Sequence, residues 1–194
     1  MTDRLETYLE THAGEAQALI EQLCRQPSIA AQNLGLNETA DLVQSLLDEA
    51  GFATQQLKVE GAPPTVYGQQ RGRSPFTLLL YNHYDVQPAV PLELWDSPPF
   101  EATVRDGKLF ARGSNDDKGQ VHMHIKALEA RLRTGLGMPV NVKLVIEGEE
   151  EIGSAHLEDF LVEYHELLAA DVIVIADSGN WRTGVPSLTT SLRG

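Results

Sequence analysis

Cysteine and basic residues are both scarce in this sequence. Cys24 is the single cysteine, so an intrachain disulfide and a zinc site built on cysteine ligands are both excluded. The 15 Lys and Arg residues stand against 28 Asp and Glu residues, which gives a formal net charge of −13. A surface of this sign repels nucleic acid and anionic lipid, so neither is expected as a partner. The acidic balance by itself does not indicate a substrate.

Long apolar runs are also absent. No stretch approaches the roughly 20 apolar residues that a membrane-spanning helix needs, so no membrane partner is expected. The segment 1–13 is polar and acidic, unlike a signal peptide, and a cytoplasmic location is expected. With 194 residues, 42% of them hydrophobic, the chain is long enough for one globular domain with a buried core.

Apolar residues recur at helical spacing in several segments, which predicts helices over 3–25, 38–50, 119–133 and 154–168. Pro27 ends the first helix, because the residue before a proline avoids the helical region. Gly51 is expected to stop the second helix, and Ser154 is expected to cap the last.

Elsewhere the apolar residues either alternate with polar ones or form short runs, which predicts strands over 53–59, 65–70, 77–82, 109–111, 140–146 and 172–176. Two of them, 77–82 and 172–176, are continuous apolar runs, which are typical of strands buried on both faces. Because strands alternate with helices, the predicted fold class is α/β, with a parallel or mixed sheet covered by helices on both faces.

Acidic residues and one histidine follow four of the predicted strands: His83 and Asp85, then Asp116 and Asp117, then Glu149, Glu150 and Glu151, and finally Asp177. The segments between these groups have about the length of a strand–crossover–strand unit, so the chain can return to the same sheet edge each time. Ligands bind outside the carboxyl ends of strands in open α/β sheets. Repelling carboxylates gathered there need cations, so a metal site is predicted.

Each of these motifs, taken alone, has a structural alternative. His83 and Asp85 are compatible with a polar turn after a buried strand. The acidic pair that follows suits the start of a helix, whose dipole favours negative charge. The run 149–151 and Asp177 suit solvated turns. The coincidence of all four groups at strand ends favours the metal site, in which His83 is a candidate ligand and Asp85 can orient its ring by accepting the other N–H.

The other histidines are not candidate metal ligands. His122 and His124 lie two residues apart on the helix predicted over 119–133, so they cannot hold one ion together. His12, His156 and His165 lie in predicted helices and are expected at the surface.

Five segments carry a family resemblance: residues 81–88 (YNHYDVQP), 95–100 (WDSPPF), 111–119 (ARGSNDDKG), 147–154 (EGEEEIGS) and 176–177 (AD). Together they resemble the M20 family of metallopeptidases, in particular its carnosinase-like, cytosolic non-specific dipeptidase branch. They span residues 81–177 and occur in the family's order. The resemblance implies a three-layer α/β/α zinc-peptidase-like catalytic domain with a mostly parallel sheet.

The resemblance also implies a role for each matching residue. The implied metal ligands are His83, Asp116, Glu151 and Asp177. His83 and Asp177 would hold the first ion and Glu151 the second, with Asp116 bridging the two. Asp85 would be the catalytic partner of His83, and Glu150 the general base. The implied cofactor is zinc, two ions per full-length subunit, with manganese or cobalt as alternatives.

The implied function is zinc-dependent hydrolysis of dipeptides or short peptides by a metal-activated water. An N-acyl-amino-acid deacylase of the same family is one alternative, and a non-catalytic metal- or peptide-binding module is another. Family members are longer and contain a lid and dimerisation domain. Residues 1–194 are therefore expected to be the N-terminal portion of an incomplete catalytic domain, inactive by itself and without one histidine ligand of the second zinc. The full-length protein is expected to be a homodimer.

Overall fold

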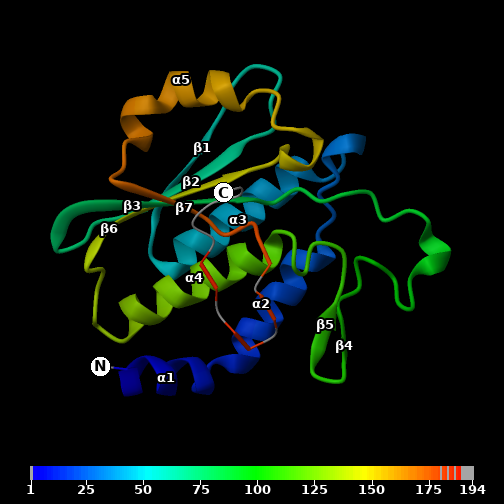
Figure 1. The fold of residues 1–194 in the computed structure, drawn as a ribbon, viewed down its shortest axis with the longest axis horizontal. Helices are drawn as coiled ribbons and strands as arrows, with labels where there is room; N and C mark the ends of the chain where they lie inside the picture. The colour runs from blue at the N-terminus through cyan, green and yellow to red at the C-terminus, as the bar shows by residue number, and fades with distance from the viewer. Residues whose placement is uncertain (1, 180, 183, 186, 189–194) are drawn as a thin grey trace.

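A mixed five-stranded sheet forms the centre of the molecule (Figure 1). The computed structural model describes residues 2–179, 181, 182, 184, 185, 187 and 188. In spatial order the strands are β1 (Ala53–Leu57), β2 (Thr65–Gln70), β6 (Val140–Glu147), β3 (Ser74–His83) and β7 (Val172–Ile175). β3 runs parallel to β6 and β7, whereas β2 runs antiparallel to both of its neighbours. All strands of this sheet except β2 point the same way, which confirms the predicted α/β class.

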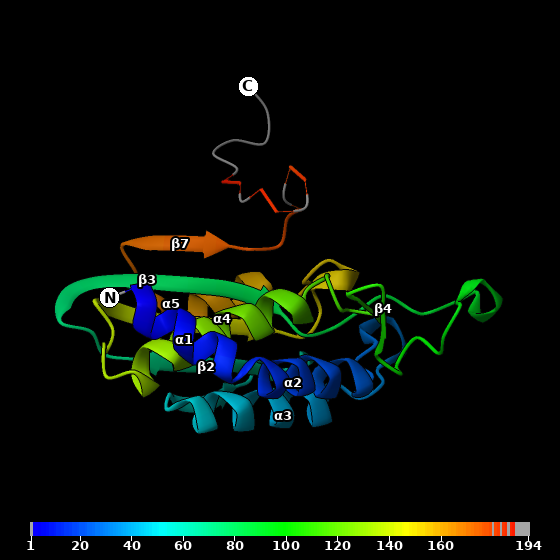
Figure 2. The ribbon, with the colours of Figure 1, turned by 90° about the horizontal axis from the view of Figure 1, so that it is seen from below.

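Helices cover both faces of the sheet and make three layers (Figure 1), and Figure 2 looks onto the helices of one face. The helices are α1 (Thr2–Thr11), α2 (Ala13–Arg25), α3 (Leu36–Ala50), α4 (Lys118–Arg133) and α5 (Leu157–Leu168). The first four lie on one side of the sheet, and α5 lies on the other. Short 3-10 turns occur at Ala30–Gln32, Leu92–Leu94 and Glu150–Ile152. No helix in the described ranges is long and apolar enough to cross a bilayer.

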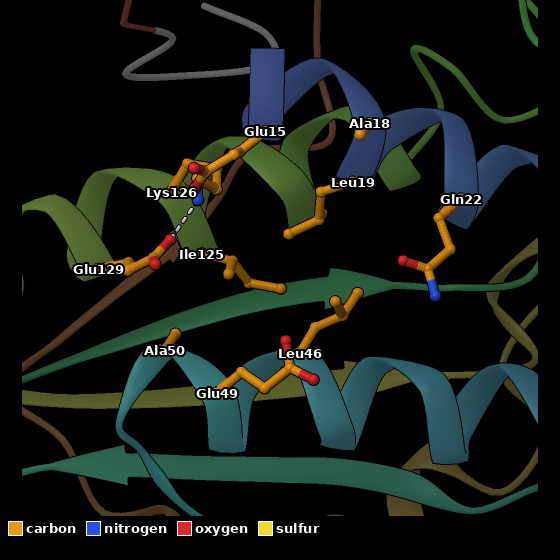
Figure 3. A pocket seen from close by; sticks show the side chains of 10 residues that line it. All are labelled: Glu15, Ala18, Leu19, Gln22, Leu46, Glu49, Ala50, Ile125, Lys126 and Glu129. Carbon is orange, nitrogen blue, oxygen red and sulfur yellow. Dashed lines mark hydrogen bonds and ion pairs between the residues drawn. The ribbon is translucent and has the colours of Figure 1, made fainter. Parts of the chain in front are cut away.

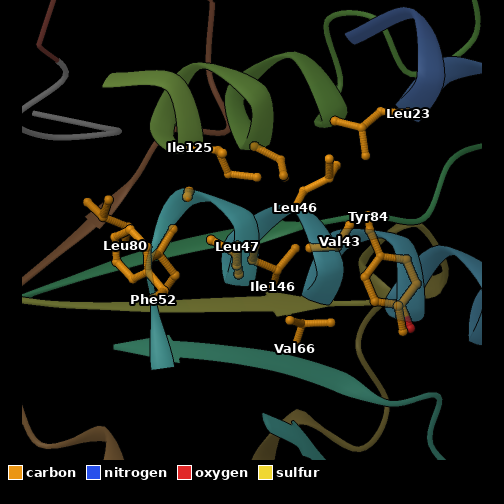
Figure 4. Close-up of a cluster of buried hydrophobic side chains, with 14 of the residues drawn as sticks. Leu23, Val43, Leu46, Leu47, Phe52, Val66, Leu80, Tyr84, Ile125 and Ile146 are labelled. Atoms are coloured by element: carbon orange, nitrogen blue, oxygen red, sulfur yellow. The ribbon is translucent and has the colours of Figure 1, made fainter. Parts of the chain in front are cut away.

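The main core lies between the sheet and α2, α3 and α4 (Figure 4). Val43 and Leu47 of α3 and Ile125 of α4 are fully buried against the strands. Along β6, Leu144 and Ile146 face this layer, whereas Val145 faces α5, because successive strand residues point to opposite faces. The sheet is therefore buried on both sides where α5 covers it.

β7 departs from the prediction of a strand buried on both faces. It lies at the edge of the described sheet, and Ile173 and Ile175 are each 62% exposed. Both line a mainly apolar cavity of about 430 Å³ beside α5. A continuous apolar run indicates that a strand can be buried, but only the neighbouring elements decide whether it is.

Two predicted helix boundaries are wrong. The helix expected over 3–25 is interrupted at His12, whose backbone (φ −105°, ψ 17°) is not helical and whose ring nitrogen Nδ1 contacts the carbonyl of Tyr8 at 2.8 Å. Ser154 does not cap α5. It has a positive φ of 46°, and its hydroxyl donates to Oε1 of Glu147 at 2.8 Å, so α5 begins after His156.

The short strand predicted over 109–111 does not belong to the main sheet. It forms β5 (Lys108–Phe110), which pairs only with β4 (Thr103–Arg105) in a separate hairpin. The guanidinium of Arg105 lies over the ring of Phe110, 4.2 Å from its centroid. The expected return of this segment to the sheet edge is therefore wrong, and Asp116 reaches that edge through the turn ahead of α4.

A second cavity, of about 300 Å³, lies between α2, α3 and α4 (Figure 3). Leu19, Leu46 and Ile125 form apolar parts of its wall, and Lys126 forms an ion pair with Glu129 at its edge. None of the residues that line this cavity belongs to the site predicted from the sequence.

Gly148 is a position where a side chain has no room. A Cβ atom there would lie 2.2 Å from the hydroxyl oxygen of Tyr84, a fully buried residue that donates to the carbonyl of Pro64. We expect Gly148→Ala to lower the free energy of unfolding by about 1–3 kcal/mol through overpacking. Urea denaturation measures this. Gly14→Ala is the control, because nothing lies within 4 Å of its Cβ position in α2, and it should not destabilise.

Candidate metal centre

Four side chains from separate segments meet at the carboxyl ends of the parallel strands. His83 is the last residue of β3, and Asp177 lies two residues beyond β7. Asp116 lies in the turn ahead of α4, and Glu150 begins the 3-10 turn that follows β6. Because β3, β6 and β7 run parallel, their ends share one edge of the sheet. Ligands bind at this edge in open α/β sheets.

The imidazole of His83 lies at the centre of this group. Its Nε2 atom is 3.1 Å from Oδ1 of Asp116, and 3.9 Å from both Oε2 of Glu150 and Oδ2 of Asp177. His83, Glu150 and Asp177 each offer a ligand atom within 4.8 Å of the others. The ring is fully buried, whereas the three carboxylate side chains are 29–59% exposed. The arrangement offers one nitrogen and several oxygen donors with an open side, which is a ligand set that zinc accepts.

Asp85 orients the ring of His83. Its carbonyl oxygen and its Oδ1 atom lie 3.1 and 3.2 Å from Nδ1 of His83, and both can only accept a hydrogen bond. In the neutral ring the proton is therefore on Nδ1, and Nε2 presents its lone pair to the carboxylates. The Asp85 carboxylate also accepts the backbone N–H groups of Glu150 and Glu151, at 3.2 and 3.0 Å. One buried side chain thus connects His83 with the loop after β6.

The group carries an excess of negative charge. Burial by itself lowers the pKa of His83. The hydrogen bond and negative charge of Asp85, together with the charges of Asp117 and Glu150, outweigh burial and raise this pKa to about 10. Burial raises the pKa of Asp117 to about 6. Burial also raises the pKa of Glu150, against the opposing charge of His83. A single imidazole cannot balance these carboxylates, so a divalent cation is a suitable countercharge.

The three consecutive glutamates point to different partners. Glu149 is buried, and its carboxylate accepts the backbone N–H of His156 at 2.7 Å. Glu150 faces His83. The Glu151 carboxylate accepts a hydrogen bond from Nε2 of Gln87 at 2.8 Å and forms no ion pair with His83 in the described part of the chain, unlike Asp116, Glu150 and Asp177. The structure therefore brings together His83, Asp116, Glu150 and Asp177, and the ligand role of Glu151 stays a prediction.

Sequence reasoning did not single out three further polar residues near this edge. Asn82 is fully buried and donates to Asp117, although it ends an otherwise apolar run, which was its only signal. Gln87 holds Glu151, as described above. Lys118 is fully buried, and its ammonium group donates to the carbonyls of Leu23 and Gln26 at the end of α2. Burial lowers its pKa to about 8.

Asp85→Asn is expected to weaken both the fold and metal binding. An amide has a single acceptor oxygen, so it cannot accept the N–H groups of both Glu150 and Glu151 and also the ring of His83. A buried donor without a partner costs about 1–3 kcal/mol of unfolding free energy. The loss of a residue that orients a histidine ligand lowers metal affinity about 10–100-fold. Urea denaturation and calorimetric zinc titration measure the two effects. Asp159→Asn, on the exposed side of α5, is the control and should change neither.

Comparison with known proteins identifies the family. Residues 79–189 match peptidase family M20/M25/M40. The chain is 44% identical over 137 residues to the Cys-Gly metallodipeptidase of Schizosaccharomyces pombe, which covers 68% of this chain and 29% of that protein. It is 32% identical over 148 residues to the succinyl-diaminopimelate desuccinylase of Aromatoleum aromaticum, which covers 75% of this chain and 37% of that protein.

The crystal structure of human carnosine dipeptidase 1 is similar to this fold, with a TM-score of 0.83 and 28% identity, over 91% of this chain and 41% of that one. The chain therefore spans less than half the length of these three relatives. The family match covers more than half of the chain, including the segments of His83, Asp116, Glu150 and Asp177. The motif resemblance is confirmed, and the chain belongs to peptidase family M20/M25/M40, with Cys-Gly and carnosine dipeptidases among its relatives.

Proposed function

We propose that the full-length protein is a zinc-dependent dipeptidase that hydrolyses the amide bond of dipeptides or short peptides. The observation that carries this proposal is the position of Nε2 of His83, 3.1–3.9 Å from three carboxylates, in a chain of a peptidase family. The dipeptidases among its relatives support a small peptide as the substrate.

His83, Asp116 and Asp177 would hold one ion, and Asp116 would also contribute to a second ion together with Glu151. The donors fit a metal, because Nε2 of the imidazole lies beside carboxylates that are partly open to solvent, and a cation can replace its proton. Manganese and cobalt accept the same nitrogen and oxygen donors and remain alternatives to zinc. The bound metal would supply a water of lowered pKa and a positive charge beside the scissile carbonyl.

Glu150 is the proposed general base. Its side chain is 36% exposed, so it is accessible to water and to a substrate, and burial raises its pKa, which makes its carboxylate a stronger base. The carboxylate takes a proton from the attacking water and then gives it to the leaving amine. Asp85 supports this step by holding both the backbone of Glu150 and the ring of His83.

An N-deacylase is the second candidate function. The similarity to a desuccinylase favours it, because removal of an acyl group from an amine also breaks an amide bond. The same base and ligands would serve both reactions, so the residues around His83 do not separate them.

A substrate panel tests the proposal. Purified full-length protein is assayed with Cys-Gly, carnosine and an N-succinyl amino acid, before and after removal of metal by a chelator. We expect the dipeptides to be hydrolysed faster, the activity to disappear with the metal, and zinc to restore it. Faster cleavage of the succinyl compound would favour the deacylase. Tight zinc binding without hydrolysis of any substrate would favour a binding module.

We also propose that residues 1–194 form the N-terminal portion of a catalytic domain, and that the full-length protein is a cytoplasmic homodimer. The coverage of the relatives supports the first point. The exposed apolar residues Val162, Ile173 and Ile175 also support it, since further polypeptide could cover them. An apolar surface of this kind otherwise favours self-association.

The chain of 194 residues is therefore expected to bind at most one zinc tightly and to hydrolyse dipeptides negligibly. Its second site has only Asp116 and Glu151 as proposed ligands, which is too few to hold an ion firmly. Calorimetric zinc titration with a parallel dipeptide assay measures both properties. Two tight sites per chain, or turnover like that of the full-length protein, would contradict this expectation.

A further inference from the structure

A series of polar side chains links α4 to the candidate metal centre. Oδ2 of Asp117 accepts a hydrogen bond from Nδ2 of Asn82 at 2.6 Å and another from the backbone N–H of His83 at 3.1 Å. Oδ1 of Asn82 lies 2.8 Å from Nδ1 of His124. Asn82 and Asp117 are fully buried, and His124 is partly buried. The hydrogen bonds therefore run from the middle of α4 to the residue that follows Asp116.

The direction of each hydrogen bond is determined by its partner. A carboxylate can only accept, so the amide nitrogen of Asn82 faces Asp117 and its oxygen faces His124. Nδ1 of His124 must then carry a proton and donate. Replacing any of the three side chains by an apolar one would remove a hydrogen bond from its neighbour.

The position of Asp117 depends on this series. Its second oxygen, Oδ1, is buried and has no hydrogen-bond partner among the described residues. Oδ2 alone anchors the carboxylate, and its shorter bond is to Asn82. Asp117 in turn holds the backbone of His83, whose ring faces the carboxylates, and it is covalently joined to Asp116. A displacement at Asn82 would therefore reach two proposed metal ligands.

We propose that His124 is a positioning residue of the metal centre. Through Asn82 it holds Asp117, and thereby His83 and Asp116, in the arrangement that binds a divalent cation. This inference rests on the proposed metal-dependent function. It assigns a role to a histidine that is not itself a ligand, and it extends the site to a helix residue behind the strand ends.

Calorimetric zinc titration of the full-length protein and its variants tests the proposal. His124→Leu removes the donor to Asn82 and is expected to raise the dissociation constant for zinc about tenfold, the lower end for groups that orient ligands. His124→Asn can place an amide N–H near the position of Nδ1 and is expected to stay within about threefold of the wild type. His122→Leu is the matched control. It removes a partly buried histidine of the same helix, one with no hydrogen bond to Asn82 in the structure, and should leave the affinity unchanged.

A measurement without metal separates positioning from general loss of stability. In a ¹H–¹⁵N spectrum, the amide proton of His83 reports its bond to Asp117. We expect His124→Leu to shift this signal upfield, whereas His124→Asn and His122→Leu leave it in place. Urea denaturation of the same metal-free variants measures their stability.

An unchanged zinc affinity and an unchanged His83 signal in His124→Leu would overturn the inference. A loss of stability with unchanged affinity would also overturn it, because the role would then be structural only. These outcomes leave the proposed function intact, since the wild-type chain would still bind zinc. No zinc binding by the wild-type full-length protein would instead overturn the proposed metal centre and this inference with it.

Discussion

Glu150→Gln in the full-length protein is expected to reduce dipeptide turnover about 10²–10⁴-fold or more while zinc stays bound. The amide keeps the size of the side chain and the backbone hydrogen bond to Asp85, but it cannot take a proton from water. The carboxylate lies 3.9 Å from Nε2 of His83, beside the proposed ligands. Steady-state kinetics with Cys-Gly, together with elemental analysis of the same samples, measure the two quantities.

The neighbouring glutamate provides the comparison for this variant. Glu151→Gln is expected chiefly to weaken one metal ion, and Glu158→Gln, which is exposed on α5, should change neither property. If Glu150→Gln loses metal and Glu151→Gln loses turnover with metal retained, the roles of the two residues are exchanged. The result is informative because Glu150 faces His83, whereas Glu151 contacts Gln87.

Asp116→Ala is expected to abolish the binding of both zinc ions in the full-length protein. As the proposed bridging ligand Asp116 serves two ions, whereas the other proposed ligands each serve one. Its Oδ1 atom is also the carboxylate oxygen at 3.1 Å from Nε2 of His83. Elemental analysis after dialysis measures the zinc content, and circular dichroism verifies that the variant is folded.

The control for this variant is Asp159→Ala, which removes an exposed carboxylate from α5. It should retain the zinc content of the wild type. A folded Asp116→Ala protein with near-wild-type zinc would contradict the bridging role of Asp116. Loss of only one of the two ions would assign Asp116 to a single ion.

The elements that the sequence predicts best are those with local stop signals. Gly51 ends α3 in the left-handed conformation with a φ of 98°, as expected for a glycine after a helix. The hairpin of β1 and β2 also follows the predicted segments. The break at His12 was missed because the apolar spacing continues across it. The predicted start of α5 was wrong because the hydroxyl of Ser154 does not cap the helix. It donates instead to Glu147, which lies seven residues earlier in the chain.

The candidate site could also be predicted in part, because several of its residues lie at the ends of strands that the sequence pattern marks. A histidine or carboxylate at the end of a buried strand, such as His83, lies at the sheet edge whatever the details of the fold. The position of Asp116 was predicted for the wrong reason, because the strand before it belongs to a separate hairpin. The series from Asp117 through Asn82 to His124 could not be predicted, since it joins residues up to 42 positions apart in the chain.

The sequence by itself determined the alternation of strands and helices, the residues at the strand ends and the family. These are local properties, because period, breakers and short motifs involve neighbouring residues. Only the tertiary structure decided that Glu150 faces His83 while Glu151 does not, that β7 is an edge strand, and that Asp117 is anchored through a single oxygen. Each of these depends on which distant side chains and strands come into contact, and such contacts are set by packing of the whole chain rather than by any one segment.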